Sequence, residues 1–120
     1  MSRTLAFVLL PALVLGAAPA QAHAMLDHAS PPVGSILRSA PRTVALWFTQ
    51  KLEPAFSTIE VRNDAGVRVD VGKAKVDGAN GSVLRVGLKP LARGRYQVHW
   101  RILSVDTHTS EGTFAFAVEQ

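Results

Sequence analysis

The residues of this chain best suited to chemistry are Asp106 and His108, an aspartate and a histidine separated by one threonine. In an extended backbone, residues two positions apart point to the same side, so the carboxylate and the imidazole are presented together. Oxygen and nitrogen donors of these kinds can hold a divalent metal ion. Asp-x-His also occurs by chance, and the pair by itself is consistent with an ordinary polar loop.

The N-terminal segment has the three-part layout of a secretory signal peptide. A positively charged start, Met1–Arg3, precedes the uncharged apolar run Leu5–Ala18, and Ala20–Ala22 is a small-x-small cleavage site. The apolar run is shorter than the about 20 residues that a spanning helix needs, which disfavours the alternative of a membrane anchor. We therefore predict a signal peptide at 1–22, export from the cytoplasm, and a mature domain at 23–120.

Cleavage at this site would make His23 the first residue of the mature chain. A histidine in that position can chelate a metal through its α-amine and its ring Nδ1 together, and the second bond costs little extra ordering entropy. With Asp106 and His108 the donors become three nitrogens and one oxygen, a set that suits tetragonal Cu(II) better than tetrahedral Zn(II). We predict one Cu(II) ion per chain, bound by His23, Asp106 and His108.

Composition narrows the remaining classes of function. The chain has no cysteine, which removes thiolate chemistry and thiolate metal sites. Its 13 Lys and Arg and 9 Asp and Glu are spread along the sequence, without a basic stripe interleaved with aromatic residues. Nucleic acid is therefore not expected as a partner.

The mature region is predicted to be all-β, because β-branched residues alternate with polar ones between turn signals and helical periodicity is absent. Phe56, Ile59 and Val61 are the expected apolar anchors of the third strand. Strands at this regular spacing favour a two-sheet sandwich or a small Greek-key barrel. The predicted strands are 23–29, 44–48, 56–62, 67–71, 83–86, 95–103 and 112–118.

The strand predicted at 95–103 has the clearest alternation. Its odd-numbered positions are polar, so His99 is expected to be a solvated sheet residue and not a ligand. His28 is likewise expected to be a surface or strand-end histidine. The residues predicted to face the core are Tyr96, Val98, Trp100 and Ile102.

The C-terminal motif is Tyr96-x-Val98-x-Trp100-Arg101-x-x-Ser104-x-Asp106-x-His108-x-x-x-Gly112-x-x-x-Phe116-x-Val118. Earlier motifs are His23, Ser30-Pro31-Pro32-x-Gly34-Ser35, Leu46-x-Phe48 and Leu52-Glu53-x-x-Phe56-Ser57. In this order they resemble the CopC family of periplasmic copper-resistance proteins over essentially the whole mature chain. The resemblance implies a seven-stranded Greek-key β-barrel and a periplasmic copper carrier or buffer. It also implies a metal role for His23, Asp106 and His108.

The resemblance carries further expectations about ligands and partners. Some family members have a glutamate close to the copper where this chain has Gln50, so Gln50 is expected at most to hydrogen-bond a ligand. Residues 63–81 contain no methionine, whereas some members have a methionine-rich loop for Cu(I) there. We therefore expect a single-site, Cu(II)-only, monomeric protein that is soluble after signal cleavage. A CopD-like inner-membrane copper transporter is the expected partner.

Two alternatives share parts of this pattern. A histidine brace also occurs in copper oxygenases that attack polysaccharides, but Asp106 would occupy a coordination position that oxygen chemistry needs open. The chain also lacks an obvious flat aromatic platform for such a substrate. A metal-free Ig-like interaction domain would make the coincidence of the cleavage site with His23 accidental. We therefore predict a copper-binding protein that is not an enzyme.

Overall fold

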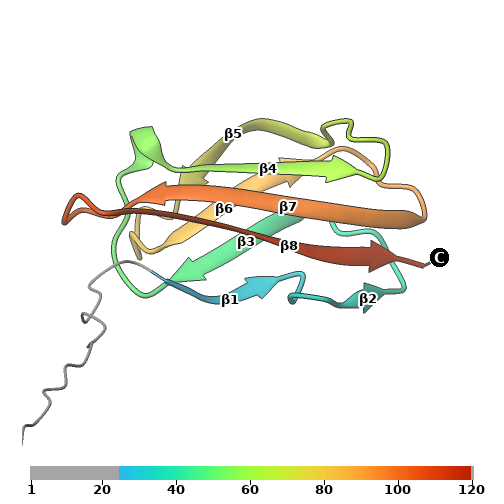
Figure 1. Cartoon of the computed structure of the whole chain (residues 1–120), viewed down its shortest axis with the longest axis horizontal. Helices are drawn as coiled ribbons and strands as arrows, with labels where there is room; N and C mark the ends of the chain where they lie inside the picture. Colours follow the sequence, from blue (N-terminus) through green and yellow to red (C-terminus); the bar gives the residue numbers. More distant parts are fainter. Residues whose placement is uncertain (1–24, 120) are drawn as a thin grey trace, which may run out of the picture.

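The alternation of apolar and polar residues builds two four-stranded β-sheets that pack face to face (Figure 1). The computed structural model describes residues 25–119. One sheet has the strand order β1-β3-β6-β5 and the other has the order β2-β8-β7-β4. The strands are β1 (Leu26–Ser30), β2 (Ile36–Leu37), β3 (Thr43–Phe48), β4 (Thr58–Asn63), β5 (Asp70–Val76), β6 (Val83–Leu88), β7 (Gly94–Leu103) and β8 (Thr109–Val118).

The core lies between the sheets and follows the pattern predicted for the long strand. The residues of β7 with even numbers, Tyr96 to Ile102, are at most 7% exposed, whereas His99 is exposed on the outer face. Trp100 packs edge to face against Phe48 of the opposite sheet, with ring centroids 5.0 Å apart. The all-β prediction and the face assignment of this strand are therefore confirmed.

The sandwich differs from the predicted strands at β2. This strand has only two residues and pairs in parallel with β8, through Ile36 with Ala117 and Leu37 with Val118. So short a segment cannot display an alternation of apolar and polar residues, so periodicity does not predict it. The described chain thus has eight strands, of which β2 is the additional one.

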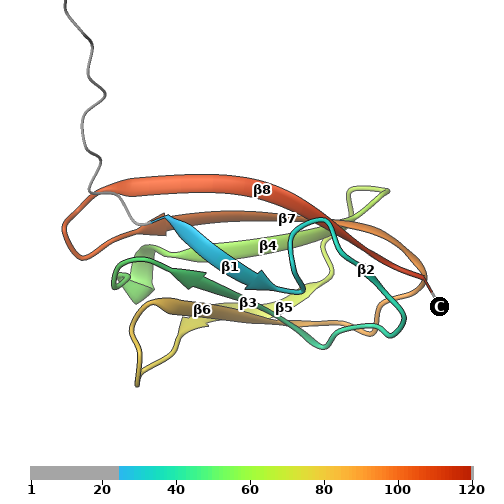
Figure 2. The ribbon, with the colours of Figure 1, turned by 90° about the horizontal axis from the view of Figure 1, so that it is seen from below.

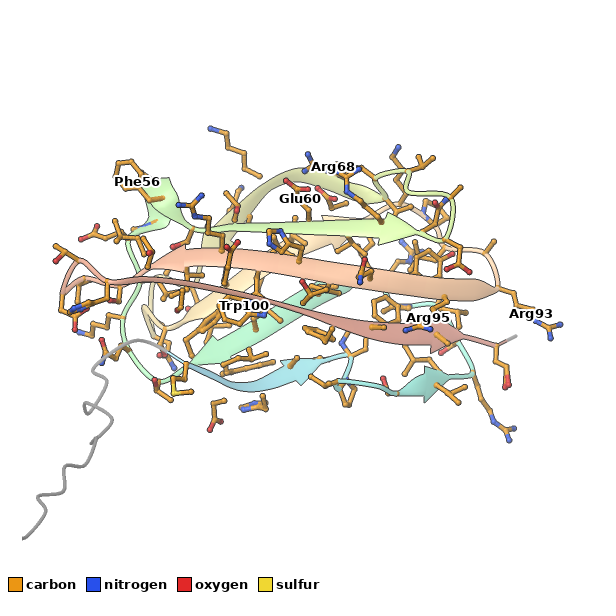
Figure 3. The ribbon with its side chains drawn as sticks, in the orientation of Figure 1. Phe56, Glu60, Arg68, Arg93, Arg95 and Trp100 are labelled. Atoms are coloured by element: carbon orange, nitrogen blue, oxygen red, sulfur yellow. The ribbon has the colours of Figure 1, made fainter. Side chains whose placement is uncertain are left out.

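Phe56 was predicted as a core anchor, and this prediction is wrong. Pro54–Phe56 form a short 3₁₀ turn, and the Phe56 side chain is 66% exposed at the corner before β4 (Figure 3). Proline suits the first position of such a turn because its φ angle is already fixed. The strand consequently begins at Thr58, and Ile59 and Val61 remain as its buried anchors.

The strand predicted at 67–71 is displaced toward the C-terminus. The turn after β4 forms as expected, with the Asn63 side chain accepting hydrogen bonds from the backbone of Ala65 and Val67. The chain then crosses to the other sheet, where β5 starts at Asp70 and pairs with β6. Because of this crossing, Val67 is exposed and Asp70 is buried.

The connections divide the sandwich into two ends (Figure 2). The His108 end contains the start of β1 and the connections 49–53, 77–82 and 104–108. The far end contains the connections 38–42, 63–69 and 89–93. Within residues 25–119, none of the helical segments is long and apolar enough to cross a bilayer. The predicted signal peptide at 1–22 and the predicted ligand His23 lie outside the described residues.

Candidate metal centre

The loop that joins β7 to β8 is fastened to the core by Ser104. This residue is fully buried, its backbone N–H donates to the carbonyl of His108 over 2.9 Å, and its carbonyl accepts from Thr107 over 2.8 Å. Thr107 adopts a left-handed conformation with φ of 71°. A β-branched residue rarely adopts this conformation, and such strain persists only where the surroundings impose it.

This tight loop brings the two predicted ligands of the described chain together. His108 Nδ1 lies 3.3 Å from Asp106 Oδ1, and the side chains are 49% and 39% exposed. The spacing predicted an extended backbone here, whereas the structure has a turn with Thr107 in the left-handed region. The pairing of the two side chains therefore arises from a different local geometry than the one expected.

A buried side chain holds the carboxylate of Asp106 in place. The buried Ser104 hydroxyl donates a hydrogen bond to Asp106 Oδ1. This hydrogen bond, followed by the influence of His108, lowers the pKa of Asp106 below its ordinary value. Asp106 is therefore an anionic oxygen donor at neutral pH. Ser104 was not predicted as a site residue, although it belongs to the motif that contains both ligands.

A short connecting segment, Thr49–Leu52, lies between the start of the described chain and this loop. On one side, Met25 N–H donates to Thr49 Oγ1 over 2.9 Å and the Thr49 N–H donates to the Met25 carbonyl over 3.0 Å. On the other side, Val105 N–H donates to the Lys51 carbonyl over 3.0 Å, and Leu52 forms a β-bridge with Ser104. Residue 25 and the loop are thus attached to the same four residues.

The remaining histidines of the described chain have other partners. His28 stacks on Trp47 with ring centroids 4.4 Å apart, and its Nδ1 lies 2.7 Å from Asp27. His99 lies 3.1 Å from Glu111 on the outer face of its sheet. Gln50 is half-buried in the connecting segment. Within residues 25–119, three or more His, Cys, Asp or Glu side chains do not meet in an arrangement that could hold a metal.

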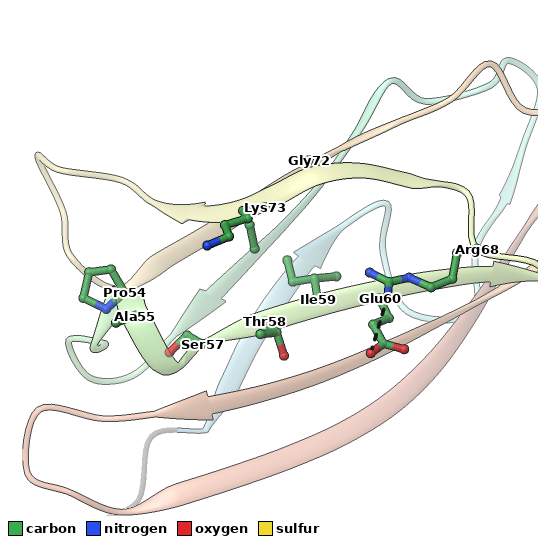
Figure 4. Close-up of a pocket in the computed structure, with 10 residues that line it drawn as sticks. Pro54, Ala55, Ser57, Thr58, Ile59, Glu60, Arg68, Gly72 and Lys73 are labelled. Carbon is green, nitrogen blue, oxygen red and sulfur yellow. Dashed lines mark ion pairs between the residues drawn. The ribbon is translucent and has the colours of Figure 1, made fainter.

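A separate groove with a volume of about 320 Å³ opens between β4 and β5 (Figure 4). Its charged residues include Glu60, Arg68 and Lys73. Glu60 already lies 4.0 Å from Arg68 and 3.0 Å from Arg62. The groove contains neither Asp106 nor His108. Its acidic side chain, Glu60, forms ion pairs with arginines and is not available to a metal.

The model of the CopC domain matches residues 26–119. The chain belongs to the CopC family. The family predicted from the sequence motifs is confirmed, and so is the all-β sandwich.

Relatives of this CopC protein are found among sequences and among solved structures. Copper resistance protein C of Xanthomonas campestris pv. juglandis is 37% identical over 118 residues, covering 93% of this chain and 92% of that protein. The crystal structure of CopC from Methylosinus trichosporium OB3b superimposes with a TM-score of 0.76 at 35% identity, covering 81% of this chain and 94% of that one. PcoC, a methionine-rich copper resistance protein from Escherichia coli, superimposes with a TM-score of 0.70 at 29% identity, covering 82% and 100%.

These matches establish the function at the level of the family. CopC proteins bind copper, and the matched relatives are named for copper resistance and not for an enzymatic activity. In this CopC chain, Asp106 and His108 form one of three exposed carboxylate–imidazole pairs within residues 25–119, the others being Asp27–His28 and Glu111–His99. The Asp106–His108 pair differs from them in being held by a buried serine. The chemistry of this pair fits Cu(II), which favours imidazole and carboxylate ligands.

Proposed function

We propose that this protein is a periplasmic carrier or buffer that binds one Cu(II) ion through His23, Asp106 and His108. The observation that carries the proposal is the exposed Asp106–His108 pair, which a buried serine holds in place beside the connecting segment Thr49–Leu52. A carboxylate and one imidazole are too few donors for a tight site. Within residues 25–119 they have no third His, Cys, Asp or Glu partner.

His23 is the residue best suited to supply further donors. Met25 is paired with Thr49 in the connecting segment, and Lys51 of the same segment is bonded to the Asp106–His108 loop. Two extended residues span about 7 Å, and we propose that this length lets His23 reach the loop. Signal cleavage after Ala22 would give His23 a free α-amine. The amine and the ring nitrogen would then complete the set with Asp106 and His108.

Copper in this proposal is cargo and is held as Cu(II). The sequence has two methionines, of which Met1 would leave with the signal peptide and Met25 is 60% exposed at the start of β1. Cu(I) favours thioether and thiolate ligands, whereas the proposed site offers amine, imidazole and carboxylate. PcoC, by contrast, is described as methionine rich. A CopD-like inner-membrane transporter is the proposed recipient of the copper.

The decisive experiment blocks the N-terminal amine. A processed protein that starts at His23 is compared with one that carries a single extra residue ahead of His23, and with one extended by the same residue at the C-terminus. The N-terminal extension converts the amine to an amide, so we expect a Kd for Cu(II) at least 100-fold higher in competition titrations. Equal affinity of all three proteins would eliminate the proposed chelate.

Electron paramagnetic resonance identifies the second histidine. His108→Ala should remove one nitrogen from the superhyperfine pattern of the Cu(II) complex. His28→Ala and His99→Ala are matched controls, because both imidazoles are engaged with other side chains, and their spectra should equal that of the wild type. Loss of binding in either control would shift the site away from the Asp106–His108 loop.

Reduction tests whether the protein is a Cu(II)-only carrier. A mild reductant together with a Cu(I)-specific chelator should strip the copper, whereas the chelator without reductant should not. Retention of copper under reduction would reveal a soft site and contradict the single-site proposal. An oxidase assay on the same loaded sample addresses the alternative of a histidine-brace enzyme, for which we expect no turnover.

A further inference from the structure

Unpaired positive charge gathers at the far end of the sandwich. The cations concerned come from two stretches, 38–42 and 89–95, that are far apart along the sequence. All of them are exposed, and none forms an ion pair with another residue of the described range 25–119. They are Arg38, Arg42, Lys89, Arg93 and Arg95.

Strand pairing is what brings these stretches together. Val118 at the end of β8 pairs with Leu37 on one side and with Gly94 on the other, so Arg38 and Arg93 leave neighbouring strand ends. In the other sheet, Leu88 N–H donates to the Arg42 carbonyl over 2.9 Å, which places Arg42 beside Lys89. Figure 3 shows Arg93 and Arg95 projecting at this end.

The far end retains a positive charge after its own acids are considered. Asp64 and Glu119 are the exposed acids there. Two other arginines near this end are already used, because Arg68 pairs with Asp70 over 2.7 Å and Arg62 with Glu60 over 3.0 Å. The unpaired cations outnumber the unpaired acids, so the surface attracts anions.

The opposite end of the molecule carries charges of both signs. Glu53, Asp77, Asp106 and Glu111 lie on its connections and strand ends together with the exposed Lys51 and Arg101, and Asp77 lies 3.7 Å from Arg85. The ten residues of β7 separate the two ends by about 33 Å. This exceeds the Debye length of about 8 Å at physiological ionic strength, so each end acts on its surroundings independently.

Aliphatic side chains accompany the cations. Ile36, two residues before Arg38, is 69% exposed, and Val67 in the turn after β4 is 55% exposed. A hollow of about 250 Å³ at this end is lined by Arg93 and Arg95 and also by the acid Asp64. Cations interspersed with exposed aliphatic side chains match the surface of an anionic bilayer, which offers phosphates to the arginines and an apolar boundary to Ile36 and Val67.

We propose that the far end docks on a bilayer surface that carries anionic phospholipids, reversibly and without insertion. In this orientation the His108 end points away from the membrane into solution. The inverse orientation is less favourable, because the His108 end presents acids as well as cations and its acids are repelled by anionic headgroups. The inference concerns a surface remote from Asp106 and His108 and does not depend on the identity of the metal.

The test is co-sedimentation of the processed protein with vesicles. Vesicles of phosphatidylcholine with an equal part of phosphatidylglycerol are compared with vesicles of phosphatidylcholine alone. We expect binding to the anionic vesicles only. Each cation at an anionic surface contributes roughly fivefold in affinity, so Arg93→Glu with Arg95→Glu should weaken binding by roughly 30-fold or more. Salt near 1 M, where the Debye length is about 3 Å, should abolish it.

The matched control makes the same change of charge elsewhere. Lys73→Glu with Lys75→Glu alters two exposed cations of β5, outside the far end, and should retain most of the vesicle binding. Circular dichroism and the unfolding midpoint verify folding, and Arg38→Glu with Arg42→Glu serves as a second far-end pair if the first does not fold. If the far-end and β5 variants lose vesicle binding equally, the net charge of the protein explains the binding and the proposal is overturned. Wild-type protein that ignores anionic vesicles but binds a polyglutamate resin would overturn it in favour of an acidic protein partner.

Discussion

Asp70 and Asp106 are two aspartates with lowered pKa values and opposite surroundings. The Asp70 side chain is 2% exposed, and its oxygens accept hydrogen bonds from Val61 N–H over 2.8 Å and from the Arg68 guanidinium over 2.7 and 3.2 Å. The Asp106 side chain is 39% exposed, and the contacts of its carboxylate with Ser104 and His108 converge on Oδ1. Asp70 has its donors inside the fold, whereas Asp106 has capacity left for a ligand.

The two lowered pKa values have different causes. Burial raises the pKa of Asp70, but the hydrogen bond from Arg68, the Val61 N–H and the charge of Arg68 together lower it below the ordinary value. The same contact raises the pKa of Arg68. For Asp106, the main cause is the single hydrogen bond from Ser104. A shifted pKa therefore does not by itself identify a functional carboxylate, whereas an exposed carboxylate anchored by a buried donor does suggest one.

The largest effect on folding is expected from Asp70→Ala. The substitution leaves Val61 N–H without an acceptor and Arg68 without its carboxylate, and we expect the free energy of unfolding to fall by about 3 kcal/mol. Urea titration measures the loss. Copper affinity of the folded fraction should remain that of the wild type, and a concurrent loss of affinity would erase the distinction between the two aspartates.

Asp106→Ala should weaken copper binding and leave the stability of the fold unchanged, the reverse of Asp70→Ala. Removing an anionic ligand is expected to raise the Kd for Cu(II) by about 100-fold, since even changes to residues that merely orient metal ligands cost about 10–100-fold. The unfolding midpoint should stay at its wild-type value because the side chain is exposed. Competition titration and urea unfolding of the same preparation provide both readouts. Unchanged copper affinity would remove Asp106 from the site.

Ser104→Ala probes the link between the core and the loop. The variant loses the hydroxyl that holds Asp106 Oδ1, and we expect a roughly tenfold weaker affinity for Cu(II). Ser57→Ala is the matched control, because Ser57 is also a buried serine, and its hydroxyl donates to the Glu53 carbonyl over 2.9 Å. If both variants weaken copper binding equally, the effect is a general loosening of the sandwich.

The smallest expected effect is on the acid stability of the protein. Because the pKa of Asp70 is lowered in the folded state, its contribution to stability is present above the unfolded value of about 3.8 and disappears as the pH falls through the folded value. Asp70→Asn should therefore flatten the decline of the unfolding free energy below about pH 4. A decline as steep as in the wild type would assign acid sensitivity to other groups.

The parts of the molecule that follow a local pattern were predictable. The alternation from Tyr96 to Ile102 predicted the buried face of β7, because side chains of a strand point to opposite sides. The proximity of Asp106 and His108 was also predictable from their spacing, although a turn produces it. The Ser104 hydroxyl was less accessible to prediction, because its burial depends on the bridge to Leu52, which is distant in sequence.

The parts that depend on topology could not be read from the sequence. Asp70 lies among valines in the sequence, and its burial results from the crossing of the chain between sheets after Val67. The far-end cations are gathered by pairs such as Leu37 with Val118, which join segments that are far apart along the chain. Long-range register of this kind leaves no trace in composition or periodicity.

The connecting segment Thr49–Leu52 has a consequence for insertions and deletions. It pairs with Met25 at one end and with the Asp106–His108 loop at the other, so its length sets the offset between them. Losing one residue there would flip the alternation and slide the chain start about 3.3 Å along the loop. In homologues that retain copper binding, length variation should therefore collect in the turns at 63–69 and 77–82 and spare 49–52, whatever residues occupy those four positions.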